Sequence, residues 1–428
     1  MFESLEAVKK VRMPRRGQQL LTLALIGVLC GCPTFVIAGY GVALFSLLIL
    51  ICQNFKLFFI DRLSVRLPKA VFGLYILYIL FFLLAANING DAALKESGMN
   101  SLMVNYLTSG FILISISCTA SDNSFINRAV TLIAWICLAG AAVTVLQFQG
   151  VKLGWGIWFL FNGSTNEALQ GIAENLDKTG SQDVVDSVFC PGLVPTQVYN
   201  GYFLCACGFA PLYKFLAADK WKHRLFWGAG VALVIAALFC AQQRSAFFIF
   251  LMLMAVMCYT RYRFLTILSI IVVLIAVTWY MSSIPLEEFG RLLDFEDNTR
   301  ERIYSAGFDF LSGHWQWGGR AIFVRTTPHG LSAHNIVFNA FIYSGICGAI
   351  CILAIYIIML WQCIRTIWNN LGHRFGYPVV FACALLAYNL ISFTHNNSLV
   401  TGEPIIFIFY ALLLQSLKLH GKKMHNME

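Results

Sequence analysis

The most constraining feature of this chain is a series of twelve apolar runs spread along its 428 residues. Each run is roughly 17–25 residues long, which is enough for a helix to cross about 30 Å of bilayer hydrocarbon. Strands of a membrane barrel alternate apolar and polar residues, and these runs do not, so each run is predicted to be a helix. The runs are placed near 20–38, 41–59, 70–87, 102–119, 129–147, 199–217, 225–242, 245–260, 264–281, 335–361, 378–394 and 403–417.

The composition agrees with a membrane protein. Hydrophobic residues make up 59% of the chain and charged residues only 12%, and soluble domains carry about twice that charged share. The first apolar run follows a basic tail, lacks a small-residue cleavage site and leads directly into the second run, so no cleaved signal peptide is expected. We therefore predict an all-α, polytopic protein with a single integral membrane domain over residues 1–428.

The basic residues predict how the chain is oriented. With twelve spans both termini lie on one side of the membrane, and that side carries 21 of the 30 Lys and Arg residues. The other side carries nine of them, together with 15 of the 21 Asp and Glu residues. Because positively charged loops tend to stay in the cytoplasm, both termini are expected to be cytoplasmic. The net charge of +9 is then mostly an orientation signal, and it does not indicate binding to nucleic acid.

Two long loops are expected on the external side, at 148–198 and 282–334. The first begins with a Trp- and Phe-rich stretch at 153–161, which is too short to span and is expected to lie on the outer face of the membrane. It is interpreted as a lid or spacer. The second loop departs from the charge rule because it gathers five arginines before it ends at His334. These are Arg291, Arg300, Arg302, Arg320 and Arg325. Such a cationic loop at a membrane surface predicts an anionic membrane ligand, such as a lipid diphosphate.

Polar residues in the predicted spans gather at their external ends. Almost no ionisable residue lies near mid-membrane, where ion-coupled transporters and proton pumps need buried charges. The external polar groups are Gln242, Gln243, Arg244, His334, Asn335, His395, Asn396, Asn397 and Glu403. This distribution disfavours a transporter or flippase and places any chemistry at the outer surface.

Three short motifs in this region resemble those of one family. His334-Asn335 is followed after nine residues by Gly345-Ile346-Cys347-Gly348, at the start of a predicted membrane helix. Gln242-Gln243-Arg244-Ser245-Ala246 forms a polar turn before another helix, and Thr299-Arg300-Glu301-Arg302-Ile303-Tyr304 places an aromatic residue four positions after a loop arginine. In this order the motifs resemble the O-antigen ligase family, over about residues 195–361. Its superfamily also holds O-antigen polymerases and some protein O-oligosaccharyltransferases.

The resemblance implies a GT-C-like membrane glycosyltransferase that acts on the periplasmic face of a bacterial inner membrane. The donor would be a polyprenyl-diphosphate-linked glycan and the transfer would invert the anomeric centre. The first expectation is O-antigen ligase, with the lipid A core as acceptor. The alternative is a polymerase whose acceptor is another lipid-linked glycan, and the compact interval of 34 residues from Arg300 to His334 weakens the ligase assignment. A protein acceptor is a third possibility. A non-catalytic membrane scaffold is disfavoured, because it would not need Arg244, Arg300 and His334 gathered on one side of the membrane.

The arginines fit the chemistry of such a transfer. Negative charge builds on the diphosphate as the anomeric C–O bond breaks, and guanidinium groups grip phosphate oxygens bidentately and stabilise the departing anion. Arg244 and Arg300 are the first candidates for catalysis and for binding the donor diphosphate, and Arg302 is the next. The structural alternatives are a helix-end anchor for Arg244 and an ion pair with Asp297 or Glu301 for Arg300.

The acceptor hydroxyl needs a base, and His334 is the candidate because neutral imidazole accepts protons near physiological pH. Its alternative is a helix-start residue that only bonds the backbone. Asn335 either orients His334 or caps the helix that follows. His314 and His329 share the loop and are interpreted as solvated side chains.

Other residues of the second loop are candidates for glycan binding. Trp315 and Trp317 offer aromatic faces for stacking on sugar rings, although membrane-interface anchoring explains them equally well. Arg320 and Arg325 are included with them, and a solvated charge is the alternative for each. Asn335 completes the possible glycan-binding set. Gly345 and the glycine three residues after it are interpreted as a close helix-packing face.

Metal binding is not expected. Asp294, Glu296 and Asp297 could hold a divalent ion through oxygen ligands, but a solvated acidic loop is the simpler interpretation. The first external loop, near Gly39, holds no carboxylate, unlike metal-dependent lipid-linked glycosyltransferases. We therefore expect a metal-independent enzyme without a cofactor, whose partners are the donor, the acceptor and membrane lipids.

Overall fold

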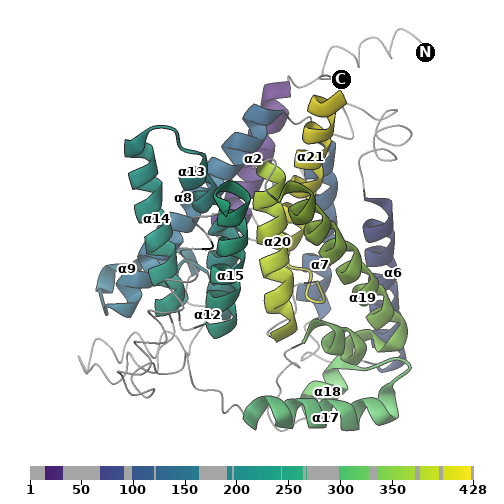
Figure 1. The fold of residues 1–428 in the computed structure, drawn as a ribbon. Helices are drawn as coiled ribbons and strands as arrows, with labels where there is room; N and C mark the ends of the chain where they lie inside the picture. The colour runs from purple at the N-terminus through teal and green to yellow at the C-terminus, as the bar shows by residue number, and fades with distance from the viewer. Residues whose placement is uncertain are drawn as a thin grey trace.

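The protein is described here by a computed structural model, which covers residues 15–31, 68–90, 99–119, 122–162, 190–194, 197–241, 243–263, 267, 298–326, 335–371, 376–394 and 399–425. Within these ranges the elements are helices and no strand is present, so the all-α prediction is confirmed. Figure 1 shows the helices gathered into a bundle.

The described helices, in chain order, are α2 (Arg15–Gly31), α6 (Lys69–Ile88), α7 (Met99–Cys118), α8 (Asn123–Phe148), α9 (Lys152–Asn162), α12 (Gln197–Cys207), α13 (Phe209–Ala217), α14 (Trp221–Cys240), α15 (Arg244–Arg261), α17 (Asn298–His314), α18 (Arg320–Thr326), α19 (Ile336–Asn370), α20 (Tyr377–Thr394) and α21 (Pro404–His425).

Four of these helices are long and apolar enough to cross a membrane: α6, α8, α14 and α19. Five further apolar helices, α2, α7, α15, α20 and α21, whose fully described stretches are shorter, lie beside them in the bundle. The chain therefore has the helical character of a membrane protein. The expected number of twelve spans stays a prediction, because 41–59 and nearly all of 264–281 lie outside the described residues.

The helix ends separate into two groups, which define two ends of the bundle (Figure 1). At the first end, Lys214 of α13 donates to Asn127 near the start of α8 (2.7 Å), and Arg263 after α15 donates to the carbonyl of Leu371 after α19 (3.4 Å). At the opposite end, the start of α19 meets the end of α20. We call this second end the outer end, because it carries the residues predicted to be external.

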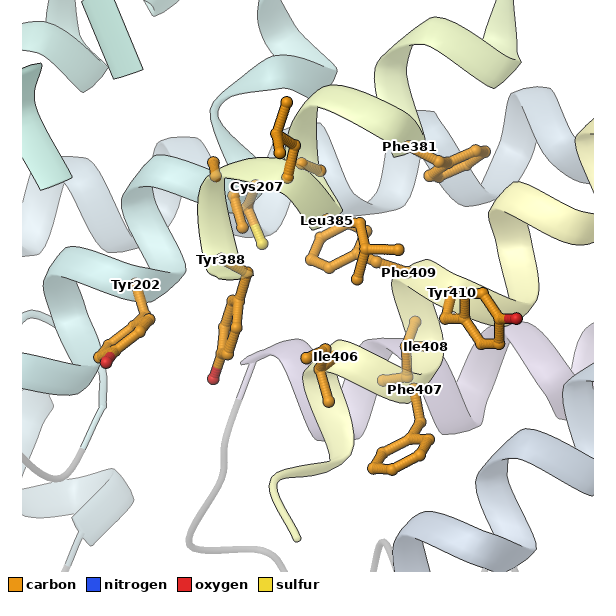
Figure 2. Close-up of a cluster of buried hydrophobic side chains, with 14 of the residues drawn as sticks. Tyr202, Cys207, Phe381, Leu385, Tyr388, Ile406, Phe407, Ile408, Phe409 and Tyr410 are labelled. Atoms are coloured by element: carbon orange, nitrogen blue, oxygen red, sulfur yellow. The ribbon is translucent and has the colours of Figure 1, made fainter. Parts of the chain in front are cut away.

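Helix α20 lies in the middle of the bundle, and this position explains why its sequence is apolar on every side. Its residues 378–389 are all buried, and it contacts α12, α15, α19 and α21. A helix that is apolar all round is expected where other helices or lipid cover every face, and for α20 the neighbouring helices provide that cover. Figure 2 shows part of this core, where Leu385 and Tyr388 lie among side chains of the α12 and α21 regions.

The predicted run 199–217 forms two helices, α12 and α13, that are separated at Gly208. A Cβ atom at Gly208 would lie 2.7 Å from a ring carbon of Phe250 in α15 and 2.9 Å from a methyl carbon of Val234 in α14. The glycine therefore permits α14 and α15 to approach this point of the backbone closely.

The first long loop is attached to the bundle at both described ends. The stretch predicted to lie on the membrane surface forms α9, whose Trp158 donates its ring N–H to the carbonyl of Val194 (2.9 Å). Gln147 of α8 both donates to the carbonyl of Gly192 (3.0 Å) and accepts from its N–H (2.8 Å). These contacts fasten residues 190–194 beside α8, and the part of the loop between 163 and 189 lies outside the described residues.

Candidate functional site at the outer end

Two helices of the second long loop, α17 and α18, lie across the outer end beside the start of α19 (Figure 1). The ring of Phe338 in α19 lies 5.8 Å from the Tyr304 ring and 4.9 Å from the Phe308 ring, both on α17. A Cβ atom at Gly307 would come within 2.3 Å of the same ring, so the glycine makes room for it. Helix α17 is thereby held against the first turn of α19.

The segment Trp315–Gly319 joins α17 to α18, and we call it the docked link. It rests on a break in α19 at Gly345, where φ is +67° and ψ is −169°. The N–H of Ile346 donates to the carbonyl of Trp315 (3.1 Å), and the N–H of Gly319 donates to the carbonyl of Ile342 (2.8 Å). Peptide groups freed by the break in α19 thus bind main-chain atoms of the link.

Gly345 is required here for two independent reasons. Its positive φ favours glycine, and a Cβ atom would lie 2.0 Å from the carbonyl oxygen of Gln316. The two glycines were expected to form one helix-packing face, but the structure gives them different roles. Gly345 interrupts the helix to receive the link, whereas Gly348 lies on the helix with Tyr78 of α6 as a neighbour (3.5 Å from a built Cβ).

The end of α6 provides a second attachment for the docked link. The amide of Asn89 donates to the carbonyl of Gly318 (3.2 Å) and to the carbonyl of Ala85 within its own helix (2.8 Å). Gly318 and Gly319 both have positive φ, at +67° and +138°. The docked link is therefore hydrogen-bonded both to the end of α6 and to α19.

The predicted glycan-binding residues of this loop have different surroundings. Arg320 begins α18 and is half-buried, with its guanidinium carbon 5.1 Å from the centre of the Tyr343 ring, which is a cation–π arrangement. Arg325 is exposed near the end of α18, Trp315 is 49% exposed, and Trp317 is half-buried. Trp315 and Arg325 are thus open to the surroundings, whereas Arg320 is packed against α19.

The residues expected to carry the chemistry are placed only in part. Arg244 is the first residue of α15, and Arg300 and Arg302 belong to the first turns of α17. Their side chains, and His334 as a whole, lie outside the described residues. Gln243, immediately before α15, is buried against Gly201 of α12, where a built Cβ would lie 2.9 Å from its Cγ.

Asn335 caps α19, which is one of the two roles predicted for it. Its side-chain oxygen accepts from the N–H groups of Val337 (3.0 Å) and Phe338 (3.1 Å). Its amide nitrogen donates to the carbonyl of Phe393 near the end of α20 (3.4 Å). The residue that follows His334 is therefore fixed to two helices.

A second segment of the outer end, residues 399–403 before α21, is held by hydroxyl groups, and we call it the tethered turn. Tyr78 of α6 and Tyr106 of α7 both donate to the carbonyl of Val400, at 3.2 and 2.6 Å. Ser109 of α7 donates to the carbonyl of Gly402 (2.5 Å). The turn is thereby placed between α6 and α7 on one side and α20 on the other.

The tethered turn ends at Glu403, which sequence reasoning did not select as a site residue. It is 4% exposed, and within the described ranges it is the only acidic or basic side chain that is buried. Its carboxylate accepts hydrogen bonds from the hydroxyls of Tyr388, Tyr199 and Thr401, the last at 3.3 Å. Burial raises the pKa of Glu403 to about 7, although these hydrogen bonds oppose the rise.

The only sequence signal for Glu403 was that it lies in a polar group between two apolar runs. A single acid at such a position is typical of an exposed turn, and nothing local in the sequence shows that three hydroxyl-bearing side chains converge on it. Two of them, Tyr199 and Tyr388, are 189 positions apart in the chain. The cluster therefore becomes visible only when α12, α20 and the tethered turn are assembled.

The described residues contain no group of three His, Cys, Asp or Glu side chains arranged to hold a metal ion. The three carboxylates considered for this purpose, Asp294, Glu296 and Asp297, lie outside the described ranges. Comparison with known proteins adds no assignment, because no family model and no curated protein matches the chain.

Proposed function

We propose that this protein is a membrane glycosyltransferase that transfers a glycan from a polyprenyl-diphosphate donor to a sugar hydroxyl at the outer, periplasmic end of its helix bundle. Joining O-antigen to the lipid A core is the first activity we assign, and polymerisation of lipid-linked repeats is the alternative. The active site is proposed to lie between the starts of α15, α17 and α19, in a bacterial inner membrane.

The observation that supports the proposal most directly is the packing of α17 on the start of α19. Tyr304 and Phe308 enclose Phe338 of α19, and Arg300 lies one helical turn before Tyr304. His334 directly precedes the cap of α19, Asn335. Tyr304 and Asn335, which lie close in sequence to Arg300 and His334, thus belong to two helix segments that pack together, although 34 residues separate Arg300 from His334 in the chain.

In the proposed reaction the acceptor hydroxyl attacks the anomeric carbon as the bond from that carbon to the diphosphate oxygen breaks. The bonding electron pair leaves with the diphosphate, whose growing charge is stabilised by Arg244, Arg300 and Arg302. His334 takes the proton of the attacking hydroxyl. Because guanidinium groups supply the positive charge, the reaction needs no metal ion.

The test uses the purified full-length protein with a lipid-linked donor and lipid A core, and it follows glycan transfer. Arg244→Ala, Arg300→Ala and His334→Ala are each expected to lower kcat about 100-fold or more, the usual cost of losing one group that stabilises a developing charge or transfers a proton. Arg261→Ala changes the last residue of α15, at the opposite end of the same helix, and is the matched control with unchanged transfer. Normal transfer by all three outer-end variants refutes the proposal.

Two further measurements refine it. A chelator should leave transfer unchanged, and loss of activity that Mg²⁺ restores contradicts the metal-independent mechanism. Deleting the gene and separating the surface polysaccharide on a gel distinguishes the two acceptors. Loss of all capped chains with accumulation of lipid-linked polymer identifies a ligase, whereas a single repeat on the core identifies a polymerase.

A further inference from the structure

The first end of the bundle, which is predicted to be cytoplasmic, carries three arginines that the proposed reaction does not use. Arg224 lies at the start of α14, Arg261 is the last residue of α15, and Arg263 follows two residues later. We call these three residues the arginine cluster. All three side chains are exposed, but their contacts show that they are not simply solvated charges.

The side chain of Tyr262 contacts two guanidinium groups of the arginine cluster. Arg224 donates to the Tyr262 hydroxyl (3.4 Å) and also to the carbonyl of Ala218, between α13 and α14 (3.1 Å). The guanidinium carbon of Arg261 lies 5.5 Å from the centre of the same ring, which is a cation–π arrangement. Positive charges from α14 and α15 are therefore held at one tyrosine.

Arg263 extends the cluster toward α19. It donates to the carbonyl of Leu371, which directly follows that helix (3.4 Å). The cluster thus connects the ends of α14, α15 and α19 along the first end of the bundle (Figure 1). The groups that it contacts within the described residues are all neutral: a phenol, with its ring face, and two main-chain carbonyls.

No carboxylate neutralises the arginine cluster within the part of the chain that the structure describes. None of its three side chains forms an ion pair there, and neither does Asp219, the exposed acidic residue that precedes α14. A guanidinium group has several N–H donors, and the hydrogen bonds to described residues use only a few of them. Neighbouring like charges repel each other, so an external anion stabilises this arrangement.

Two exposed tryptophans indicate the depth of the cluster in the membrane. Trp221 begins α14 and is 67% exposed, and Trp368 lies in the last turn of α19 and is 73% exposed. Tryptophan is enriched at the level of the lipid headgroups. Arg224 follows Trp221 within one helical turn, and Arg263 binds the chain just after the α19 tryptophan. The guanidinium groups are therefore expected at the depth of lipid phosphates, with exposed apolar residues such as Leu225 nearby on α14 to contact acyl chains.

We propose that Arg224, Arg261 and Arg263 form a binding site for the phosphate headgroup of an anionic phospholipid in the cytoplasmic leaflet. Guanidinium groups bind phosphate oxygens bidentately and are weakly hydrated, so they stay charged when partly desolvated. Basic groups between helices on the cytoplasmic side bind acidic headgroups in this way. The bound lipid neutralises the cluster and joins the ends of α14, α15 and α19. The site is at the opposite end from the proposed glycan transfer and does not depend on it.

The general excess of positive charge on this side explains the orientation of the chain but not this arrangement. An orientation signal requires only that Lys and Arg lie on the cytoplasmic side. Lys222 meets that requirement: it is exposed on α14 and makes no hydrogen bond or ring contact with the described residues. The arginines of the cluster are instead fixed by a tyrosine and by main-chain carbonyls, so they lose less conformational freedom on binding, which favours a specific ligand.

The experiment uses the purified full-length protein in phosphatidylcholine nanodiscs with increasing shares of phosphatidylglycerol. Native mass spectrometry measures which lipid stays bound, and the thermal midpoint reports the stabilisation that binding produces. The unmodified protein should retain phosphatidylglycerol preferentially, and its midpoint should rise with the share of that lipid. Arg224→Gln and Arg261→Gln are each expected to weaken phosphatidylglycerol binding about tenfold, the effect of losing one hydrogen-bonding group that contacts an ion.

Lys222→Gln is the matched control, because it removes the same charge from the same helix without touching Tyr262. Since an isolated exposed charge is screened by salt, phosphatidylglycerol binding should change by less than about twofold. Arg261→Lys keeps the charge but lacks the planar fork of donors, so it should restore only part of the binding. Thermal midpoints in pure phosphatidylcholine check that each variant is folded. Arg261→Gln is the safest variant in this respect, because its side chain makes no hydrogen bond to a described residue.

Equal losses of binding in Lys222→Gln and Arg261→Gln overturn the site, because the lipid then responds only to net charge. An unmodified protein that retains both lipids equally overturns it as well. Inorganic phosphate added to pure phosphatidylcholine nanodiscs distinguishes a lipid headgroup from a soluble anion. It should leave the midpoint unchanged, and a rise as large as that caused by phosphatidylglycerol overturns the assignment to a lipid. None of these measurements follows glycan transfer, so their outcome is independent of the proposed enzymatic activity.

Discussion

The docked link and the tethered turn are both irregular segments at the outer end, yet they are held in opposite ways. The docked link, Trp315–Gly319, is held largely by main-chain atoms that meet the break in α19. The tethered turn, 399–403, is held by side-chain hydroxyls of α6, α7, α12 and α20. In the first case glycines clear space for backbone contact, and in the second case particular polar side chains must be present.

This difference determines how each segment responds to mutation. A main-chain contact survives changes of most side chains but fails when a Cβ atom fills the gap. A hydroxyl contact tolerates extra volume elsewhere but fails when a single oxygen atom is removed. The two segments therefore call for different substitutions, and the predictions below are ordered by the size of the expected effect.

Gly345→Ala is expected to have the largest effect. The substitution places a Cβ atom 2.0 Å from the Gln316 carbonyl and forces an L residue into a left-handed conformation, which alone costs about 1–3 kcal/mol. Release of the docked link should be detected as faster proteolysis between α17 and α18, with a lower thermal midpoint. Gly313→Ala is the control, since a Cβ atom there meets nothing within 4 Å. Equal proteolysis of the two variants would show that the break does not hold the link.

Glu403→Gln is expected to change how stability depends on pH. Because the pKa of Glu403 is raised in the folded protein to about 7 from an ordinary value of 4.5, its contribution to stability is greatest below pH 4.5 and is lost as the pH rises through 7. Thermal unfolding should show that the stability of the original protein falls relative to that of Glu403→Gln between pH 5 and pH 8. Parallel stability curves for the two proteins would contradict the burial of an ionisable carboxyl.

Tyr106→Phe tests the side-chain attachment of the tethered turn. The shortest hydroxyl contact to Val400 disappears, but Tyr78 still donates to the same carbonyl, so the free energy of unfolding should fall by only about 1 kcal/mol. Changing both tyrosines to Phe should cost more than the sum of the two single changes, because the carbonyl then loses both tyrosine donors. Strict additivity in chemical denaturation would show that the two hydroxyls do not share this acceptor.

Asn89→Ala should have the smallest effect. It removes the 3.2 Å hydrogen bond to Gly318, worth about 0.5–1 kcal/mol, together with the local bond to the Ala85 carbonyl at the partly exposed end of α6. The main-chain contacts of the docked link stay intact. Limited proteolysis of the link should therefore change little. A loss of protection as large as that of Gly345→Ala would show that α6, rather than the break in α19, fixes the link.

The sequence predicted the helical class, and it offered capping as one of two roles for Asn335, because both depend on local patterns: apolar runs of spanning length, and an amide immediately before such a run. The break at Gly345 was not predicted, since a glycine within an apolar run is compatible both with helix packing and with a positive φ. Only the backbone of a distant segment, Trp315–Gly319, distinguishes these two possibilities.

The site was predictable to a lesser degree than the fold. The motifs direct attention to the second long loop, the turn at 242–246 and the start of α19, but the buried carboxylate cluster depends on Tyr199, Tyr388 and Thr401, which share no motif. Its members are brought together by the packing of α12 against α20 and by the course of the tethered turn. Such convergence is a property of tertiary structure, and local patterning carries little information about it.

The main-chain attachment of the docked link has a consequence for engineering. The break in α19 at Gly345 binds peptide groups of the link, so most side chains are compatible with positions 315–317. Glycine is needed only at Gly318, Gly319 and Gly345. A foreign loop of matching length that ends in two glycines should therefore dock on the same break in α19. Exchange of this segment between proteins would then change the side chains presented at the outer end of the bundle without rebuilding the helices beneath it.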